Sequence, residues 1–294
     1  MNTRIRLSQL NWVAAVLLAL PSIASATILA TSSFEDNTLG ALSGQGGGSG
    51  WTGNWTAPGL ATRADVVDTT SSPLVYAIPG GAVINGESKA LEAQLLPGLT
   101  GNQLCGVRTL AAPISETFYV GYLVRYTGPE WAGGNNTFTL HLGINSSSTT
   151  TLNFGLRGGA PDEFVIRYAT GTPVTGASTG GQLVNNTTYY LVARVNYSGG
   201  SFVSANMWLN PSQTDDVDTP SGDASLTLTP FANPITHIFF RQAALQADDI
   251  IQADELRIGT TWGDVVLVPE PGSVTLLSLG AAALLIFRRS HHRA

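Results

Sequence analysis

Clustered carboxylates are the first residues in this sequence whose spacing could support chemistry. Asp248, Asp249, Asp254 and Glu255 lie in one short segment near the C-terminal end of the central region. A glycoside hydrolase needs two carboxylates that flank the scissile bond, about 5 to 9.5 Å apart. Alternate side chains of a β-strand point to opposite faces, so these acids do not all face one side. The sequence therefore predicts no catalytic residue and favours a protein that is not an enzyme, with a glycoside hydrolase as the alternative.

Thiol and zinc chemistry are also disfavoured. The chain has one cysteine, Cys105, so it cannot form an intramolecular disulfide. A catalytic thiolate needs a histidine partner, and the central region offers only His141 and His237, each flanked by apolar residues. Two histidines without a second cysteine make a poor zinc site. We expect Cys105 to be a small buried residue of the core.

Tryptophans beside glycine-rich segments are candidates for ligand contact. Trp51 and Trp55 follow the run 45–50, and Trp131 lies in a second glycine-rich segment. Indole rings present a broad apolar face with a polar edge, which suits stacking on sugar rings. The competing interpretation, that these tryptophans pack the loops onto the domain, is favoured. No helix is predicted after the run 45–50, so we expect a flexible loop there and not a phosphate site.

Four aspartates between Asp215 and Asp223 share a loop with Pro220 and Gly222. Calcium takes about six to eight oxygen ligands, and this loop could supply several of them. The loop lacks the ordered spacing of an EF-hand, so a solvated acidic loop is the favoured interpretation.

The elements that must position these side chains are almost all β-strands. Segments rich in aromatic and β-branched residues predict strands; they cover 117–126, 137–144, 163–168, 188–197, 202–209, 235–241 and 250–258. Turn clusters rich in glycine, proline and asparagine separate them, and no helical period exceeds two turns between the termini. Many strands without βαβ alternation predict an all-β fold, an antiparallel two-sheet sandwich.

The central region of about 240 residues is acidic. It contains nine basic and nineteen acidic residues, so its net charge is −10, compared with −6 for the whole chain. This charge argues against nucleic acid, whose binding needs basic patches, and it disfavours anionic lipid. Abundant Gly, Thr, Ser and Asn give a neutral hydrogen-bonding surface that suits an extracellular protein among polysaccharides.

The N-terminus predicts export. Arg4 and Arg6 precede a short apolar run, and Ala24 and Ala26 fit the small-x-small cleavage pattern of a secretory signal peptide. We therefore predict a signal peptide over residues 1–26.

The C-terminus predicts a membrane tether. An apolar segment at 272–287 is followed by Arg288 and Arg289. Basic residues stay on the cytoplasmic side, so the central region is expected outside the cytoplasm. As a transmembrane helix the segment would span roughly 24 Å, against a hydrocarbon core of about 30 Å. Such a marginal anchor suits a temporary attachment.

A proline-bracketed motif precedes that apolar segment. In order along the chain the tail has Val268, Pro269, Glu270, Pro271, the apolar segment, Arg288 and Arg289. This arrangement resembles the PEP-CTERM sorting signal of exported bacterial proteins, a tail also named after ice-binding proteins. The resemblance implies a Gram-negative bacterium that makes exopolysaccharide, with processing by an exosortase-type membrane transpeptidase and release to the cell surface or extracellular matrix. A plain single-pass anchor is the alternative.

Segments 189–211 and 253–262 carry a second resemblance. They are similar to laminin-G-like jelly rolls of the concanavalin A type. This resemblance implies that 253–262 is a closing strand paired near a first strand at 28–35. It also implies a structural calcium where those strands meet, with Glu35 and Asp254 as ligands. The triplet of acids that jelly-roll glucanases place on one strand, Glu-x-Asp-x-x-Glu or close to it, is missing from this sequence.

These observations predict three parts: a signal peptide at 1–26, a jelly-roll β-sandwich at 27–265, and a sorting segment at 266–294 with a transmembrane helix at about 272–287. The predicted role is structural or adhesive, with weak glycan contact and exopolysaccharide as a partner. A carbohydrate-active hydrolase and an ice-binding protein are the alternatives. Ice binding would need a flat array of regularly spaced threonines, and the threonines here show no fixed repeat.

Overall fold

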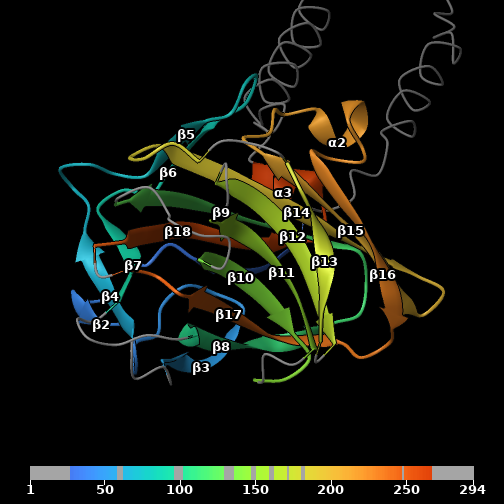
Figure 1. Cartoon of the computed structure of the whole chain (residues 1–294), viewed down its shortest axis with the longest axis horizontal. Coiled ribbons are helices and arrows are strands. Elements are labelled where there is room, and N and C mark those ends of the chain that lie inside the picture. The colour runs from blue at the N-terminus through green and yellow to red at the C-terminus, as the bar shows by residue number, and fades with distance from the viewer. Residues whose placement is uncertain are drawn as a thin grey trace, which may run out of the picture.

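Two antiparallel β-sheets pack face to face in the computed structural model of the chain (Figure 1). The structure describes residues 27–57, 62–95, 102–128, 136–146, 150–158, 162–170, 172–179, 183–246 and 248–266. The fold is an all-β sandwich, which confirms the fold class predicted from the sequence.

Within the described residues the larger sheet has nine strands. They are β1 (Ile28–Ser32), β2 (Gly40–Ala41), β4 (Thr62–Asp68), β7 (Lys89–Leu95), β9 (Phe118–Thr127), β14 (Thr188–Ser198), β15 (Ser201–Leu209), β16 (Ala224–Phe231) and β18 (Ile250–Gly259). Their order is β16-β15-β14-β9-β18-β7-β4-β2, and β1 also pairs with β18. The first strand and the closing strand therefore pair, as the sequence predicts.

The smaller sheet has seven strands in the same described ranges. They are β3 (Trp51–Thr56), β8 (Asn102–Ile114), β10 (Thr137–Gly143), β11 (Thr150–Arg157), β12 (Glu163–Thr170), β13 (Thr172–Ser178) and β17 (Ile235–Ala243). Their order is β13-β12-β11-β10-β17-β8-β3. The seven strands predicted from residue type are present in the two sheets, within two residues of their predicted bounds, and the first strand, expected at 28–35, ends at Ser32.

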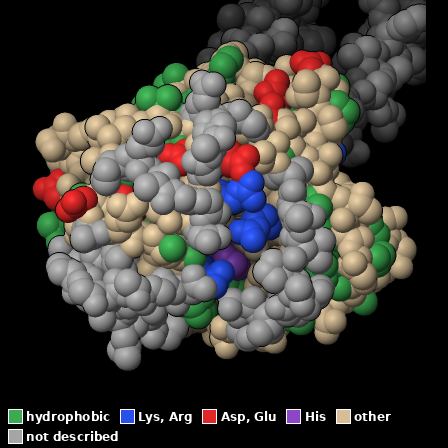
Figure 2. Space-filling view, viewed as in Figure 1, with side chains coloured by type: hydrophobic (Ala, Val, Ile, Leu, Met, Phe, Trp, Pro, Cys, Tyr) green, Lys and Arg blue, Asp and Glu red, His purple; other side chains and the backbone are tan. Residues whose placement is uncertain are grey.

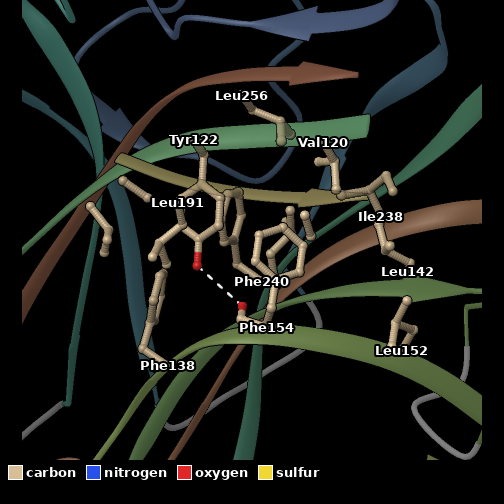
Figure 3. Close-up of a cluster of buried hydrophobic side chains, with 14 of the residues drawn as sticks. Val120, Tyr122, Phe138, Leu142, Leu152, Phe154, Leu191, Ile238, Phe240 and Leu256 are labelled. Atoms are coloured by element: carbon tan, nitrogen blue, oxygen red, sulfur yellow. Dashed lines mark hydrogen bonds between the residues drawn. The ribbon is translucent and has the colours of Figure 1, made fainter. Parts of the chain in front are cut away.

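The main core fills the space between the sheets. Because side chains alternate along each strand, one face of each sheet supplies it with apolar residues. Figure 3 shows Tyr122 of β9 reaching across to β11, where its hydroxyl donates a 3.2 Å hydrogen bond to the carbonyl of Phe154. Phe240 packs its ring edge-to-face against Tyr122 at 5.8 Å. Burial of this core is the main stabilising contribution to the fold.

A second apolar cluster covers the outer face of the nine-stranded sheet. It is formed by the hairpin β5 (Val75–Ala77) and β6 (Val83–Asn85), by the short helix α3 (Trp262–Val266), and by outward side chains such as Tyr190 and Trp208. The Tyr190 hydroxyl donates a 2.7 Å hydrogen bond to the carbonyl of Val265. Both faces of this sheet are therefore buried around β9 and β14, which explains why the central strand β9 is apolar along almost its whole length.

Helical structure is limited in the described part of the chain. The four-residue helix α2 (Asp215–Asp218) lies in the acidic loop. Among the described residues, none of the helices has the length and apolar character needed to cross a bilayer. The predicted signal peptide with Ala24 and Ala26, and the predicted transmembrane helix, lie outside the described residues.

Candidate functional site

The glycine-rich run 45–50 lies against strand β1. Ser49 and Thr31 exchange two backbone hydrogen bonds of 3.0 and 3.1 Å, and the guanidinium of Arg108 donates to the carbonyl of Gly47 at 2.7 Å. The sequence predicted a flexible loop here, but the structure shows a loop that is hydrogen-bonded to β1 and to Arg108.

Trp55 is part of the main core. Its side chain is fully buried, and its ring lies 6.0 Å from Phe34 and 6.3 Å from Phe240. The Arg108 guanidinium lies 5.5 Å from the same ring. Burial lowers the pKa of Arg108 to about 10. Trp55 therefore takes the packing role that the sequence left open, and its faces are covered by protein.

Trp51 is only partly buried. Its indole N–H donates a 2.7 Å hydrogen bond to the carbonyl of Thr31, and the Arg108 guanidinium lies 5.1 Å from its ring. Of the three tryptophans proposed for glycan contact, Trp51 is thus the one with an exposed part among the described residues. Trp131 lies outside them.

Glu35 and Asp254, the predicted calcium ligands, come from the turn after β1 and from β18. The Glu35 carboxylate accepts hydrogen bonds from the Ser88 N–H and hydroxyl and from the Lys89 N–H, at 2.6 to 2.9 Å. The Lys89 ammonium donates to the carbonyls of Glu35 and Asn37 at 2.7 and 2.8 Å. Glu35 therefore fixes the start of β7, and its carboxylate oxygens are already engaged.

Asp254 is buried, and its Oδ1 accepts a 2.7 Å hydrogen bond from the N–H of Glu255. Its buried Oδ2 has no hydrogen-bond partner among the described residues. The described residues contain no group of three or more His, Cys, Asp or Glu side chains that could hold a metal ion. Calcium takes roughly six to eight oxygen ligands. The described residues of this site offer one carboxylate oxygen without a partner, Oδ2 of Asp254, so they do not fit a calcium ion. The calcium site stays a prediction from resemblance alone.

We predict that Asp254 makes stability depend on pH. Burial raises its pKa well above the ordinary value, and the charges of Glu255, Glu35 and Glu87 raise it further. The folded chain thus holds this proton more tightly than the unfolded chain. The free energy of unfolding should fall as pH rises from about 4, the ordinary aspartate value, through the folded pKa. Asp254→Asn should flatten that part of the profile.

Urea unfolding of the two proteins across this pH range measures the effect, with a chelator present and then with calcium. A profile that keeps its slope in Asp254→Asn would contradict the assignment. A calcium-dependent stabilisation of the wild type that the variant lacks would instead show that a metal neutralises Asp254.

Local hydrogen bonds engage each aspartate of the acidic loop. Asp215 accepts from the N–H of Ser212 at 2.8 Å, Asp218 from the Thr214 hydroxyl at 2.6 Å, and Asp223 from the N–H of Leu209 at 2.7 Å. Asp216 pairs with Arg194 at 2.6 Å and accepts from the Tyr119 hydroxyl at 2.9 Å. The four aspartates therefore stabilise the loop and its contact with the sheet through hydrogen bonds and one ion pair.

The acids at 248–255 do not gather at one site. Asp249 is fully buried and accepts a 2.8 Å hydrogen bond from the Tyr126 hydroxyl, whereas Glu255 pairs with Arg257 at 2.6 Å. Cys105 is fully buried, and burial raises the pKa of its thiol to about 12. These placements leave the acids and the thiol in structural roles.

The outer face of the seven-stranded sheet carries a polar group that the sequence patterns did not single out. One row across the sheet runs Phe239, His141, Asn153 and Arg167, on β17, β10, β11 and β12. The next row places Arg241 opposite Thr139, and Thr139 opposite Gly155. In the third row Arg157 lies opposite Glu163 and forms an ion pair with it. We call Arg157, Arg167 and Arg241 the arginine cluster.

His141 lies at the base of this group. It is buried, and its ring stacks on Phe239 with centroids 4.9 Å apart. Its two ring nitrogens lie 2.8 and 3.0 Å from the hydroxyl oxygens of Thr139 and Thr151. Burial lowers the pKa of His141 well below the ordinary value, and the nearby charges of Arg241 and Arg167 add to this. The ring is therefore neutral at pH 7 and engaged at both nitrogens.

Figure 2 shows this face of the molecule. Blue Lys and Arg side chains gather beside a purple histidine in a hollow over the smaller sheet. Burial lowers the pKa of Arg167, and the charges of Arg157 and Arg241 lower it further, so both of these arginines act on Arg167. Several arginines around a neutral, polar surface are typical of a site that binds anions.

A family match identifies the tail. Residues 267–290 match the PEP-CTERM protein-sorting motif. The chain thus carries this motif at its C-terminus, as the sequence resemblance predicts, and the motif implies export, recognition by an exosortase and sorting to the surface. The motif residues Val268, Pro269, Glu270, Pro271, Arg288 and Arg289 lie outside the described residues.

No curated protein matches the chain by sequence. Among solved structures it is similar to the carbohydrate esterase vb_24B_21 from Shiga toxin-encoding bacteriophage phi24B, at 14% identity and a TM-score of 0.45, over 80% of this chain and 98% of that one. It is also similar to the cellulose induced protein Cip1, at 15% identity and a TM-score of 0.45, over 79% and 97%. The T. cruzi calreticulin globular domain is similar at 14% identity and a TM-score of 0.44, over 90% and 100%.

Proposed function

We propose that this chain is a surface or matrix protein whose β-sandwich contacts glycans without cleaving them. The observation that carries the proposal is the sorting motif at 267–290, which begins directly after α3 ends at Val266. The tail that implies sorting is thus joined without a long linker to a compact sandwich. The signal peptide, the temporary membrane anchor and the adhesive role belong to this proposal.

The chemistry of the described residues supports a non-catalytic role. His141 is engaged at both ring nitrogens, so it is poorly placed to take a proton from a substrate. On the same face, the carboxylate of Glu163 is paired with Arg157. A glycoside hydrolase needs two carboxylates across a scissile bond, and the carboxylate described on this face, Glu163, is already paired with an arginine.

Cell fractionation with mass spectrometry of both mature termini tests the export part of the proposal. We expect the chain outside the cytoplasm, starting near Thr27 and shortened near the Pro-Glu-Pro motif. Glu270→Ala should leave the protein in the membrane fraction with its tail intact, because the motif is then broken. Glu116→Ala, at an exposed position of the sandwich, is the matched control for loss of an acid. Recovery of the full-length chain from the cytosol with its leader intact would overturn the proposal.

Incubation with neutral and acidic polysaccharides tests the non-catalytic part. We expect no new reducing ends and no unsaturated products. Glycan cleavage that is lost in His141→Gln or Glu163→Gln, with folding unchanged, would instead support the carbohydrate-active enzyme that the sequence left as an alternative.

A further inference from the structure

The arginine cluster is assembled by strand register. Arg241 lies on β17, Arg157 on β11 and Arg167 on β12, and each occupies a position on the same side of its strand as His141. The residues between them in sequence, such as Phe240 and Ile166, point into the core. All three guanidiniums therefore extend from one face of one sheet.

The dimensions of the cluster suit an extended chain. Neighbouring strands lie about 4.8 Å apart, so the backbones of Arg241 and Arg167 are about 14 Å apart across the strands and, being in neighbouring rows, about 7 Å apart along them. One sugar residue of an extended polysaccharide is comparable in length to one strand spacing. A glycan that crosses the strands would thus meet the two arginines about three residues apart.

A glycine and small polar residues form the base between the arginines. Gly155 has no side chain, and a Cβ there would lie 2.3 Å from the carbonyl of Phe138, so this position cannot be filled without shifting the backbone. Beside it lie Thr139 and Asn153, which are small, polar and buried, and the neutral ring of His141 adds no fourth positive charge. Figure 2 shows the resulting hollow with the cationic side chains in it.

The described residues balance the charges of the cluster only in part. Arg157 pairs with Glu163. Among the described residues, no side-chain hydrogen bond or ion pair is made by the guanidinium of Arg167 or of Arg241. Like charges held together repel one another, and an anionic ligand relieves that repulsion.

We propose that the outer face of the seven-stranded sheet binds a uronate-containing polysaccharide, with Arg167 and Arg241 each contacting a carboxylate of one extended chain. This names the ligand class of the glycan-binding role proposed above and rests on it. A planar guanidinium matches a carboxylate through two parallel hydrogen bonds, which selects acidic over neutral sugars.

Nucleic acid is the other polyanion that could meet three arginines. Double-stranded DNA carries a charge about every 1.7 Å of its axis, and its binding needs a broad basic surface. Here the cluster sits in a region of net charge −10, which repels a dense polyanion beyond the hollow. The carboxylates of a polyuronate are more widely spaced, so they fit a small cluster better.

Affinity electrophoresis and calorimetry of the full-length protein in detergent, with alginate or polygalacturonate, test this inference. We expect retention by the polyuronates that weakens as salt is added, because exposed charges are screened. Arg167→Ala and Arg241→Ala should each weaken binding about tenfold, and the double variant about a hundredfold. Arg125→Ala, which removes an arginine from the other sheet, is the matched control and should bind as the wild type does.

Unchanged polyuronate binding by a folded Arg167→Ala, Arg241→Ala double variant would overturn the inference. Stronger binding of a neutral glucan, a sulfated glycan or DNA than of the polyuronates would also overturn it. Binding of a neutral glucan alone would leave the proposed function standing, whereas a chain retained in the cytosol would end the proposed function whatever the cluster binds. Arg167→Gln keeps a polar side chain, so loss of binding in this variant separates charge from packing.

Discussion

Replacing Gly50 with alanine is expected to lower the free energy of unfolding by about 2 to 5 kcal/mol, from a left-handed backbone and from overpacking together. Gly50 has φ +79°, and a Cβ there would lie 1.9 Å from the carbonyl oxygen of Leu29 and 2.7 Å from the Cα of Ala30. Both obstacles belong to the backbone of β1, so no side-chain rotation can relieve the contact. Either β1 shifts away from β18 or the loop leaves β1.

Gly53 provides the matched control for this prediction. It has nearly the same backbone angle, φ +76°, but a Cβ there meets none of the described atoms within 4 Å. Gly53→Ala should therefore lose only about 1 to 2 kcal/mol, the part due to the left-handed conformation. Urea unfolding of the two variants beside the wild type measures the difference. Equal losses would show that the close approach of Gly50 to β1 contributes nothing.

This loop also shows where composition misleads. Glycine-rich sequence predicts flexibility, yet here glycine is required because two backbones approach too closely for any side chain. Gly48 has the same property, since its Cβ would lie 2.0 Å from the carbonyl of Thr31. The partner of the loop is β1, which lies about twenty residues earlier. Only the folded chain shows that the two segments are in contact.

The strands were predictable wherever aromatic and β-branched residues are dense, as in β9 and β14. The pairing of β1 with β18 followed from the jelly-roll resemblance. Strands such as β4 and β16 were not predicted, because Ala, Asp and Pro in them have weak strand propensity, and pairing with distant strands stabilises them instead.

The arginine cluster could not be read from the sequence for a different reason. Each arginine alternates with apolar residues, as in the segment Phe164–Arg167, so every strand alone resembles ordinary sandwich sequence. The cluster exists only once the register of β17, β10, β11 and β12 is known. The negative net charge of the central region argued against a basic site. A net charge is a sum over roughly 240 residues, so it does not reveal a local face of opposite sign.

The sequence left open whether Trp51 and Trp55 pack in the domain or contact a ligand, and their burial in the structure now distinguishes them. Trp55→Ala is expected to lower the free energy of unfolding by about 3 to 5 kcal/mol, because a fully buried indole leaves a cavity between the sheets. Trp51→Ala should lose only about 1 to 2 kcal/mol, since it removes one hydrogen bond to Thr31 and one contact with Arg108. Thermal and urea unfolding of both variants test the contrast.

Trp55→Phe separates packing from sugar contact. Phenylalanine keeps an aromatic ring beside Phe34 and removes the buried indole N–H, which has no hydrogen-bond partner among the described residues. This variant should therefore fold, with a smaller loss of stability than Trp55→Ala, and it should bind glycans as the wild type does. A folded Trp55→Phe protein that has lost glycan binding would show that the indole reaches the ligand. The loop would then have to open away from the core during binding, because both faces of the ring are covered in this structure.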